Sequence, residues 1–191
     1  GIPRQSGLCS TLTAQIILEY NRFNEEAIKE LDQYSHIWVI FYFHKLKKKP
    51  DKARVRPPRL GGNKSVGVYS SRSPYRPNPI GLSMVQLESI EVSKKEIIIN
   101  ISSHDLLDQT PVLDIKPVVS TDLPTTTPNF GWQQTTWHIL EVHFSPDIKA
   151  SKTTKATIVD ILQQDPRPAY DKTRESNKIY KMSFNNLNIN F

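Results

Sequence analysis

The sequence predicts a mainly β protein, an antiparallel barrel or sandwich followed by a small α+β subdomain at the C-terminus. Two observations indicate this class. Short segments rich in β-branched and aromatic residues recur through the first two thirds of the 191-residue chain, with Gly, Pro, Asn or Asp between them. Strand and helix patterns do not alternate there, so the βαβ units of a doubly wound parallel sheet are not expected.

Seven segments are the expected strands. The longest apolar run, residues 37–43, has the length of a buried strand. It is much shorter than the roughly 20 apolar residues of a membrane span, so no membrane partner is expected. The strands are expected at residues 12–18, 37–43, 66–69, 82–90, 97–101, 112–115 and 137–144.

An early helix and a late loop interrupt this pattern. Residues 24–31 predict a short helix, because Asn24 can cap it and the acidic Glu25 and Glu26 fall in its first turn. Residues 120–134 are rich in Thr and Pro and have no clear periodicity, so they predict a long loop that could move.

The C-terminal quarter predicts a helix and a strand. Residues 153–164 carry a helical stripe of apolar side chains, and Pro166 prevents its continuation. A strand-like tail follows at residues 178–184. We therefore expect a domain over residues 1–146 and a smaller one over residues 147–191.

Positive charge is concentrated in one part of the chain. The net charge is +6, and residues 45–59 contain eight Lys or Arg side chains opposed only by Asp51. Such a cluster suits a phosphate backbone. The alternative interpretation is a solvated, lysine-rich loop that keeps the protein soluble.

The most constrained loop covers residues 70–83. Its three prolines fix the backbone and hold Arg72 and Arg76 on a stiff segment. Gly81 then allows the chain to turn or to approach a ligand closely. A basic binding loop and a Pro-rich connector between two strands are both consistent with this pattern.

Several kinds of site are not supported by the motifs. There is no G-x-G-x-x-G after a strand, residues 61–64 lack the spacing of a phosphate-binding Walker loop, and no Ser lies in a G-x-S-x-G elbow. The histidines are scattered and Cys9 is the only cysteine, so no metal is expected. The single cysteine also favours a reducing compartment, and we expect the cytoplasm.

Several rigid polar segments remain as candidates for a cleft. With the stretches around them and with residues 57–63 they make six blocks, which occur in this order: residues 1–5, GIPRQ; 37–45; 57–63, PPRLGGN; 72–83, RSPYRPNPIGLS; 105–108 with 110–117; and 165–170, DPRPAY. In this order the six blocks resemble the TsaA-like family, the TrmO tRNA methyltransferases, over nearly the whole chain.

The resemblance implies a fold, a reaction and partners. The family fold is a small antiparallel β-barrel, distinct from the Rossmann type. Its members work as homodimers and use S-adenosylmethionine. The family reaction is N6-methylation of threonylcarbamoyladenosine next to the anticodon of tRNA. A protein with this fold does not need the G-x-G-x-x-G motif of Rossmann folds, which is absent from the sequence.

The resemblance also implies the cofactor residues. Arg or Lys would pair with the methionyl carboxylate, backbone groups near Leu82 and Leu106 would contact the adenine edge, and an acidic residue would hold a ribose hydroxyl or lie near the sulfonium. The implied set is Pro3, Arg4, Gln5, His44, Lys45, Arg72, Leu82, Asp105, Leu106, Leu107 and Asp108.

The catalytic assignment falls on residues 165–170. The carbamoyl group withdraws the lone pair of the acceptor nitrogen, so loss of its proton would help the transfer. We expect this segment to close over the acceptor, with Arg167 holding the threonyl carboxylate and Asp165 or Tyr170 close to the nitrogen. The alternative is that Asp165 caps the preceding helix and Arg167 braces the dimer.

Two other functions remain open at this point. One is a non-catalytic RNA-binding barrel, which would not bind S-adenosylmethionine. The other is methyl transfer to a small molecule or a protein, in which case affinity for tRNA would lack a steep dependence on salt.

Overall fold

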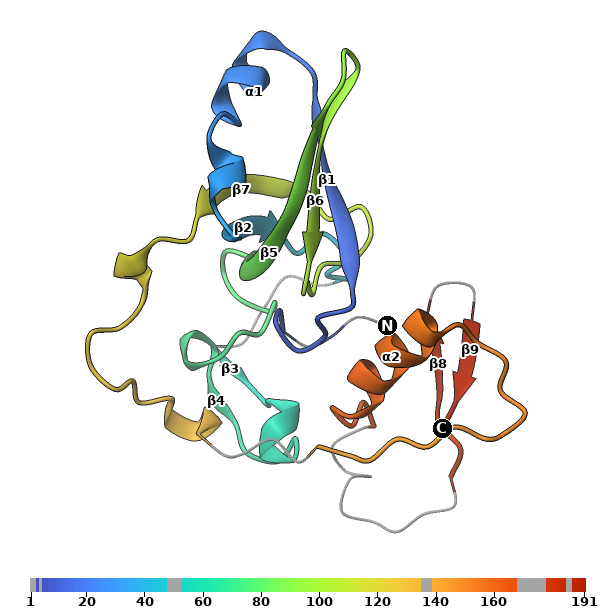
Figure 1. The fold of residues 1–191 in the computed structure, drawn as a ribbon. Helices are drawn as coiled ribbons and strands as arrows, with labels where there is room; N and C mark the ends of the chain where they lie inside the picture. Colours follow the sequence, from blue (N-terminus) through green and yellow to red (C-terminus); the bar gives the residue numbers. More distant parts are fainter. Residues whose placement is uncertain (1–2, 4, 48–52, 135–138, 168–177, 185–186) are drawn as a thin grey trace.

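A five-stranded antiparallel sheet carries the main apolar core and occupies the upper part of the view in Figure 1. A computed structural model describes residues 3, 5–47, 53–134, 139–167, 178–184 and 187–191. The strand order is β1-β6-β5-β2-β7, which confirms the mainly β, antiparallel prediction. The strands are β1 (Thr13–Glu19), β2 (His36–Tyr42), β5 (Ile80–Val92), β6 (Glu96–Ser102) and β7 (Val112–Pro117).

Alternation along the strands places the core on one face of this sheet. Successive side chains point to opposite faces of a strand, so every second residue is buried. The fully buried aliphatic side chains come from β2, β5 and β6 and make one apolar cluster. Its most buried members are Ile37, Val39, Val85, Ile97, Ile99 and Ile101.

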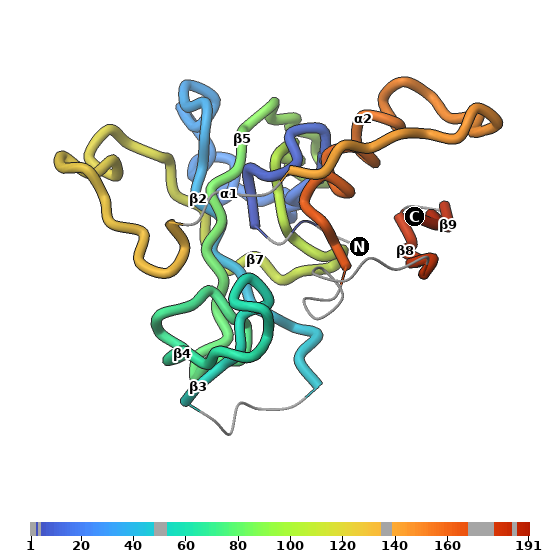
Figure 2. Tube along the Cα trace, turned by 90° about the horizontal axis from the view of Figure 1, so that it is seen from below, coloured from blue at the N-terminus to red at the C-terminus, as the bar shows by residue number. Residues whose placement is uncertain are grey.

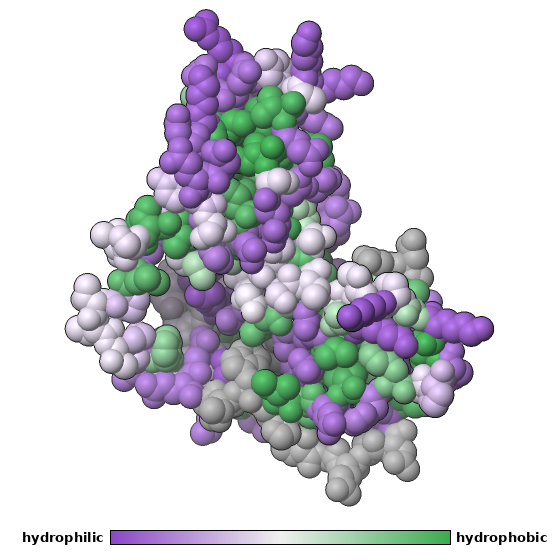
Figure 3. All heavy atoms as spheres, viewed as in Figure 1, coloured by the Kyte–Doolittle hydropathy of each residue, from purple (hydrophilic) through white to green (hydrophobic). Residues whose placement is uncertain are grey.

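The sheet is curled around this core. Leu18 of β1 and Ile115 of β7, from strands at opposite ends of the strand order, line the same open cavity of about 570 Å³. The other wall is the helix α1 (Arg22–Ala27), and Figure 3 shows apolar surface next to it, framed by hydrophilic residues. In the described residues β1 and β7 are not paired with each other, so closure into a barrel stays a prediction.

The cap of helix α1 lies three residues earlier than the sequence indicates. The cap is Asn21, whose side chain accepts a 2.8 Å hydrogen bond from the backbone N–H of Asn24. Asn24 lies inside the helix and donates its own side-chain amide to the carbonyl of Glu19. The prediction of Asn24 as the cap was wrong: Asn24 is the third helical residue and supplies the N–H that the cap side chain of Asn21 accepts.

A small hairpin lies below the sheet in Figure 1. It pairs β3 (Arg54–Val55) with β4 (Val66–Gly67). Residues 66–69 were expected to be one strand, but β4 ends at Gly67 and a 3-10 turn follows at Val68–Ser70. β3 was not predicted, since its two residues sit within the basic cluster and give no periodic signal.

The long loop after β7 is attached to the rest of the protein at two tryptophans. The indole N–H of Trp38 donates to Asp122 at 2.9 Å, and the indole N–H of Trp132 donates to the carbonyl of Ser70 at 2.9 Å. The expected strand at residues 137–144 was wrong for residues 139–144, which have no regular structure. Residues 137–138 lie outside the described part of the chain.

The C-terminal region contains α2 (Lys152–Leu162) and a hairpin of β8 (Lys181–Phe184) and β9 (Leu187–Asn190). The side chain of Ser151 caps α2. Two views place these elements on the side of the molecule opposite the loop after β7 (Figures 1 and 2). The helix and β8 agree with the predicted elements, β9 was not predicted, and the division near residue 146 stays a prediction.

Candidate functional site

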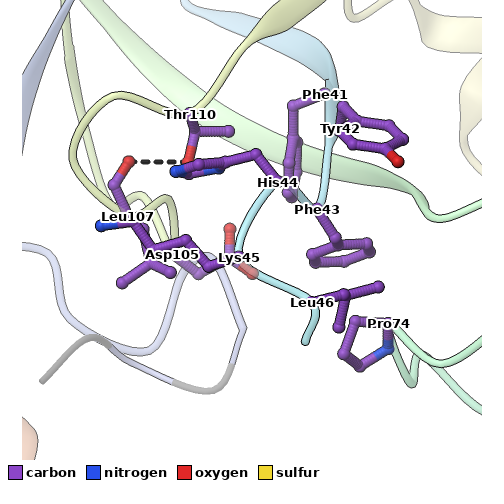
Figure 4. Close-up of a pocket in the computed structure, with 10 residues that line it drawn as sticks. All are labelled: Phe41, Tyr42, Phe43, His44, Lys45, Leu46, Pro74, Asp105, Leu107 and Thr110. Atoms are coloured by element: carbon purple, nitrogen blue, oxygen red, sulfur yellow. Dashed lines mark hydrogen bonds between the residues drawn. The ribbon is translucent and has the colours of Figure 1, made fainter. Parts of the chain in front are cut away.

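A pocket of about 150 Å³ lies where β2 ends and meets two loops (Figure 4). Its walls are mostly apolar and aromatic, with a few polar groups, which is the usual character of a small-molecule site. The lining residues are Phe41, Tyr42, Phe43, His44, Lys45, Leu46, Pro74, Asp105, Leu107 and Thr110.

Backbone hydrogen bonds bring these three segments together. The N–H of Phe43 donates to the carbonyl of Pro79 at 2.9 Å, and the N–H of Tyr42 donates to the carbonyl of Pro111 at 3.0 Å. The end of β2 is therefore held between the Pro-rich loop and the turn at residues 105–111. In Figure 4, Phe43, Leu46 and Pro74 lie on one side of the pocket, and His44, Leu107 and Thr110 lie on the other.

The aromatic wall depends on a glycine in the neighbouring strand. Gly81 of β5 lies directly opposite Phe41 of β2, and a Cβ atom at Gly81 would be 2.2 Å from the Phe41 ring. The ring of Phe41 packs edge-to-face on Phe43, with centroids 5.1 Å apart. Gly81 was expected to allow a turn or a ligand; it lies in a regular strand and admits an aromatic ring instead.

Asp105 is held from the core side of the sheet. The buried hydroxyl of Ser83 donates a 2.5 Å hydrogen bond to Asp105 Oδ1. The turn that follows is closed by Thr110, whose hydroxyl donates to the carbonyl of Leu107 at 2.7 Å (dashed in Figure 4). Ser83 thus holds the Asp105 carboxylate at the pocket, and Thr110 closes the turn that follows it.

His104, immediately before the pocket, has a structural role. The backbone N–H of Leu106 donates to its Nδ1 at 3.2 Å, so the neutral ring carries its proton on Nε2, which lies 3.3 Å from the carbonyl of Thr13. Burial lowers the pKa of His104 below its ordinary value. The ring is therefore a neutral brace under the 105–111 turn.

The Nε2 atom of His44 indicates that the pocket suits a polar ligand atom. This atom is buried and has no hydrogen-bond partner among the described residues. A buried polar atom without a partner costs about 1–3 kcal/mol, which a polar ligand atom would offset. The pocket is smaller than the roughly 300 Å³ at which drug-sized ligand sites begin. The described walls therefore fit one portion of a ligand as large as S-adenosylmethionine.

The structure brings four of the predicted cofactor residues to one place. His44, Lys45, Asp105 and Leu107 line the pocket together. The sequence reasoning missed the aromatic walls, because alternating apolar residues in residues 37–43 indicate a strand core and say nothing about the strand's end. It also missed the contribution of Ser83 and Thr110, which lie in two of the family-like blocks but were given no role there.

The other predicted cofactor residues do not line this pocket. Their positions range from core to open surface. Leu106 is in the core cluster, Asp108 is exposed in the turn, Arg72 is exposed two residues before Pro74, Leu82 is 52% exposed on the outward face of β5, Pro3 is buried and Gln5 is half-buried. Arg4 lies outside the described residues.

Asp165 and Arg167 form a two-pronged ion pair away from these walls. Arg167 donates through Nε to Oδ1 at 2.7 Å and through Nη2 to Oδ2 at 3.0 Å. Asp165 has a left-handed backbone, with φ of 49°, and its N–H donates to the carbonyl of Leu162 as α2 ends. Neither residue lines the pocket. Tyr170 is outside the described residues.

Within the described ranges no group of three or more His, Cys, Asp or Glu side chains is arranged to hold a metal ion. Among those same residues, no helix is both long and apolar enough to cross a bilayer.

Comparisons with known proteins match both parts of the chain. The family model of the tRNA-methyltransferase O N-terminal domain matches residues 1–122, and that of the TrmO C-terminal domain matches residues 138–191. The tRNA (adenine(37)-N6)-methyltransferase of Escherichia coli K12 is 36% identical over 200 residues, covering 98% of this chain and 84% of that protein.

Two further comparisons agree with these. A Pseudomonas aeruginosa protein whose name describes an S-adenosylmethionine-dependent methyltransferase is 37% identical over 183 residues, covering 90% of this chain and 76% of that protein. A crystal structure of TrmO has a TM-score of 0.70 at 30% identity, covering 98% of this chain and 82% of that one.

Proposed function

The chain belongs to the TrmO family of tRNA methyltransferases, and from this premise we propose that it is an S-adenosylmethionine-dependent tRNA (adenine(37)-N6)-methyltransferase. The observation that carries the proposal is the meeting of His44, Lys45, Asp105 and Leu107, which belong to separate family-like blocks, around a single pocket. We place the reaction in the cytoplasm, in keeping with the single cysteine.

S-adenosylmethionine, when bound, supplies a methyl group that is already activated for transfer by its sulfonium. The residues of the pocket bind and orient it. Asp105, fixed by Ser83, accepts a ribose hydroxyl or faces the positive sulfonium, and His44 Nε2 bonds a polar atom of the cofactor. The aromatic and aliphatic walls exclude water, and Lys45 at the exposed rim attracts the carboxylate.

The acceptor is proposed to be threonylcarbamoyladenosine. Arg167 holds the threonyl carboxylate, because a guanidinium offers a planar set of donors that matches a carboxylate. Asp165 orients that guanidinium through its two hydrogen bonds. The acceptor nitrogen would have to lose its proton in the transfer, and the Asp165 carboxylate, or Tyr170 as its phenolate, would lie close enough to accept it.

The basic cluster is proposed to contact the phosphates of tRNA. In the described part of the cluster, Arg54 serves the hairpin itself, donating to Ser65 Oγ at 3.0 Å and to the Ser65 carbonyl at 2.7 Å. Lys47 and Arg56 are exposed. These are the positions from which side chains reach a phosphate backbone.

The homodimer is proposed to form on the outward face of the sheet. Three cross-strand pairs of β2 and β5 are apolar on this face, and several of their members are more than 40% exposed. Contiguous apolar surface of this kind marks an interface. A partner that covers it would also bring Leu82 into an enclosed site. The pairs are Trp38 with Met84, Ile40 with Leu82 and Tyr42 with Ile80.

One experiment tests the function directly. The protein is incubated with labelled S-adenosylmethionine and total tRNA, from cells with and without threonylcarbamoylation, and the nucleosides are analysed by mass. We expect a methyl group on N6 of threonylcarbamoyladenosine and none in tRNA that lacks this modification. Cofactor binding without methylated tRNA would favour a small-molecule or protein substrate. Binding of tRNA without cofactor would favour the RNA-binding module.

A further inference from the structure

Helix α2 is attached to the N-terminal segment by three side-chain hydrogen bonds. Asp160 Oδ2 accepts one from the Thr11 hydroxyl at 3.0 Å and one from the Cys9 thiol at 3.5 Å. Gln164, one turn later, donates from Nε2 to the carbonyl of Leu8 at 2.6 Å. All three cross more than 140 residues of sequence, so they define how the C-terminal region sits on residues 8–11.

These bonds are shielded by apolar packing. Cys9 is 1% exposed and clusters with Ile161 of α2 and Phe184 of β8. Hydrogen bonds next to an apolar cluster are stronger than those exposed to water. A buried donor or acceptor that loses its partner there destabilises the protein. Burial also raises the pKa of Cys9, so the thiol keeps its proton and remains a donor to Asp160.

The same N-terminal segment is joined on its other side to the pocket. The N–H of Gly7 donates to the carbonyl of Ser103 at 2.8 Å, and the N–H of Ser103 donates to the carbonyl of Leu12 at 3.0 Å. Ser103 has a left-handed backbone, with φ of 59°, and lies two residues before Asp105. Residues 7–12 therefore lie between α2 and the turn that carries Asp105.

Helix α2 leads in the other direction to the proposed acceptor residues. Gln164 comes one residue before Asp165, whose N–H closes the last turn of the helix on Leu162. Between Gln164 and the Asp165–Arg167 pair there is thus no flexible linker. Movement of the end of α2 relative to residues 8–11 would move this pair relative to the pocket.

We propose that Asp160 and Gln164 are positioning residues that hold the Asp165–Arg167 pair at a fixed place relative to the pocket, through residues 7–12. This rests on the proposed function, in which the pocket binds the cofactor and Arg167 binds the acceptor. Neither Asp160 nor Gln164 lines the pocket. Their loss should therefore affect the acceptor and leave cofactor binding intact.

The test compares shape-matched variants. Asp160→Leu keeps the shape of the side chain and removes its acceptor atoms, whereas Asp160→Asn keeps one acceptor oxygen for Thr11. Gln164→Met removes the donor to Leu8 and is the second variant if Asp160→Leu does not fold. Gln163→Met is its matched control, at the adjacent position.

We expect kcat/KM for tRNA to fall roughly ten- to hundredfold in Asp160→Leu and in Gln164→Met, because a displacement near 1 Å can have this effect. The Kd for S-adenosylmethionine, by calorimetry, should stay within about twofold. Asp160→Asn and Gln163→Met should stay close to the parent. Hydrogen exchange at the backbone N–H groups of Gln164, Asp165 and Arg167 should become faster in Asp160→Leu and in Gln164→Met.

The outcomes separate this inference from the proposed function. A parent protein that methylates no tRNA overturns both. An active parent with unchanged kcat/KM in both damaged variants overturns the positioning role alone. Equal losses in cofactor binding and tRNA turnover, accompanied by a lower Tm, would also overturn it, because they indicate a general effect on folding.

Discussion

The hydroxyl of Ser83 and the carboxylate of Asp105 are joined by a 2.5 Å hydrogen bond that connects the core of the sheet to the pocket. Ser83 is only 2% exposed and lies opposite Val39 on the core face of β5, where an aliphatic residue would be expected. A buried hydroxyl needs a partner. The pocket provides it, so the strand and the site stabilise each other.

Ser83→Ala should therefore weaken the site more than it changes the fold. A hydrogen bond to a charged group contributes about 1.5–3 kcal/mol. We expect roughly tenfold weaker binding of S-adenosylmethionine, measured by calorimetry. Ser89→Ala is the matched control, because Ser89 is exposed on the same strand and accepts a hydrogen bond from Asn100 away from the pocket. Equal effects of the two substitutions would contradict the role of Ser83.

Gly81→Ala should destabilise the protein and disturb the aromatic wall. The new methyl group would overlap the Phe41 ring, which is itself only 5% exposed and has little room to move. Overpacking of this kind costs about 1–3 kcal/mol, seen as a lower free energy of unfolding in denaturant. Gly67→Ala is the control, since its Cβ would meet only Ser70 Oγ, at 3.9 Å. A Gly81→Ala protein as stable as the parent would disprove this packing.

His44→Phe should have opposite effects on the free and the bound protein. Removing a buried nitrogen without a partner leaves the free protein as stable as before, or more stable. Loss of the bond to the cofactor should weaken binding roughly tenfold. Thermal unfolding with and without S-adenosylmethionine measures both effects. In the control His36→Phe, at the far end of β2, cofactor binding should be unchanged.

His104 should make the folded state less stable in mild acid. Its pKa is lowered in the folded protein by burial, so between that value and about 6.5 the unfolded chain binds a proton that the folded protein does not. The contribution of His104 is complete above the unfolded pKa and is lost as pH falls. Protonation of Nδ1 would also break the hydrogen bond from Leu106.

The measurement is Tm between pH 7.5 and 5.5. We expect the decrease in Tm to be smaller in His104→Gln, which cannot titrate, than in the parent protein. His143→Gln should retain the parent's pH dependence, because the His143 side chain is 78% exposed and its pairing with Glu141, at 3.3 Å, lies on the surface. An unchanged slope in His104→Gln would show that other groups cause the acid sensitivity.

Leu82→Glu should dissociate the proposed dimer without unfolding the chain. The side chain is 52% exposed, so a carboxylate there is tolerated in the free protomer but is desolvated without a partner in an interface. Light scattering at micromolar concentration should give the mass of one chain. Gln86→Glu, on the same face of the same strand, is the control and should remain dimeric. A parent protein that is already monomeric would remove the proposal.

Much of the fold follows from local patterns. Residues 37–43 and 97–101 are mostly apolar and rich in β-branched side chains. Such side chains pack well on the half-buried pleated surface of a sheet, so both segments are predicted as strands. α2 follows in the same way from its apolar stripe and from Pro166. The errors occur where a pattern is short or ambiguous, as at the two-residue β3 and at Asn21, which competes with Asn24 for the cap.

The mainly β class, the strands of the core and the family-like blocks can be read from the chain alone, because each depends on neighbours within a few residues. Which blocks meet became visible only in the folded molecule: His44, Lys45, Asp105 and Leu107 share a pocket, whereas Leu82 faces outward and Asp165 pairs with Arg167. The fold also places Gly81 against the Phe41 ring and Ser83 against Asp105. These contacts depend on strand register and sheet curvature, which result from packing of the whole core.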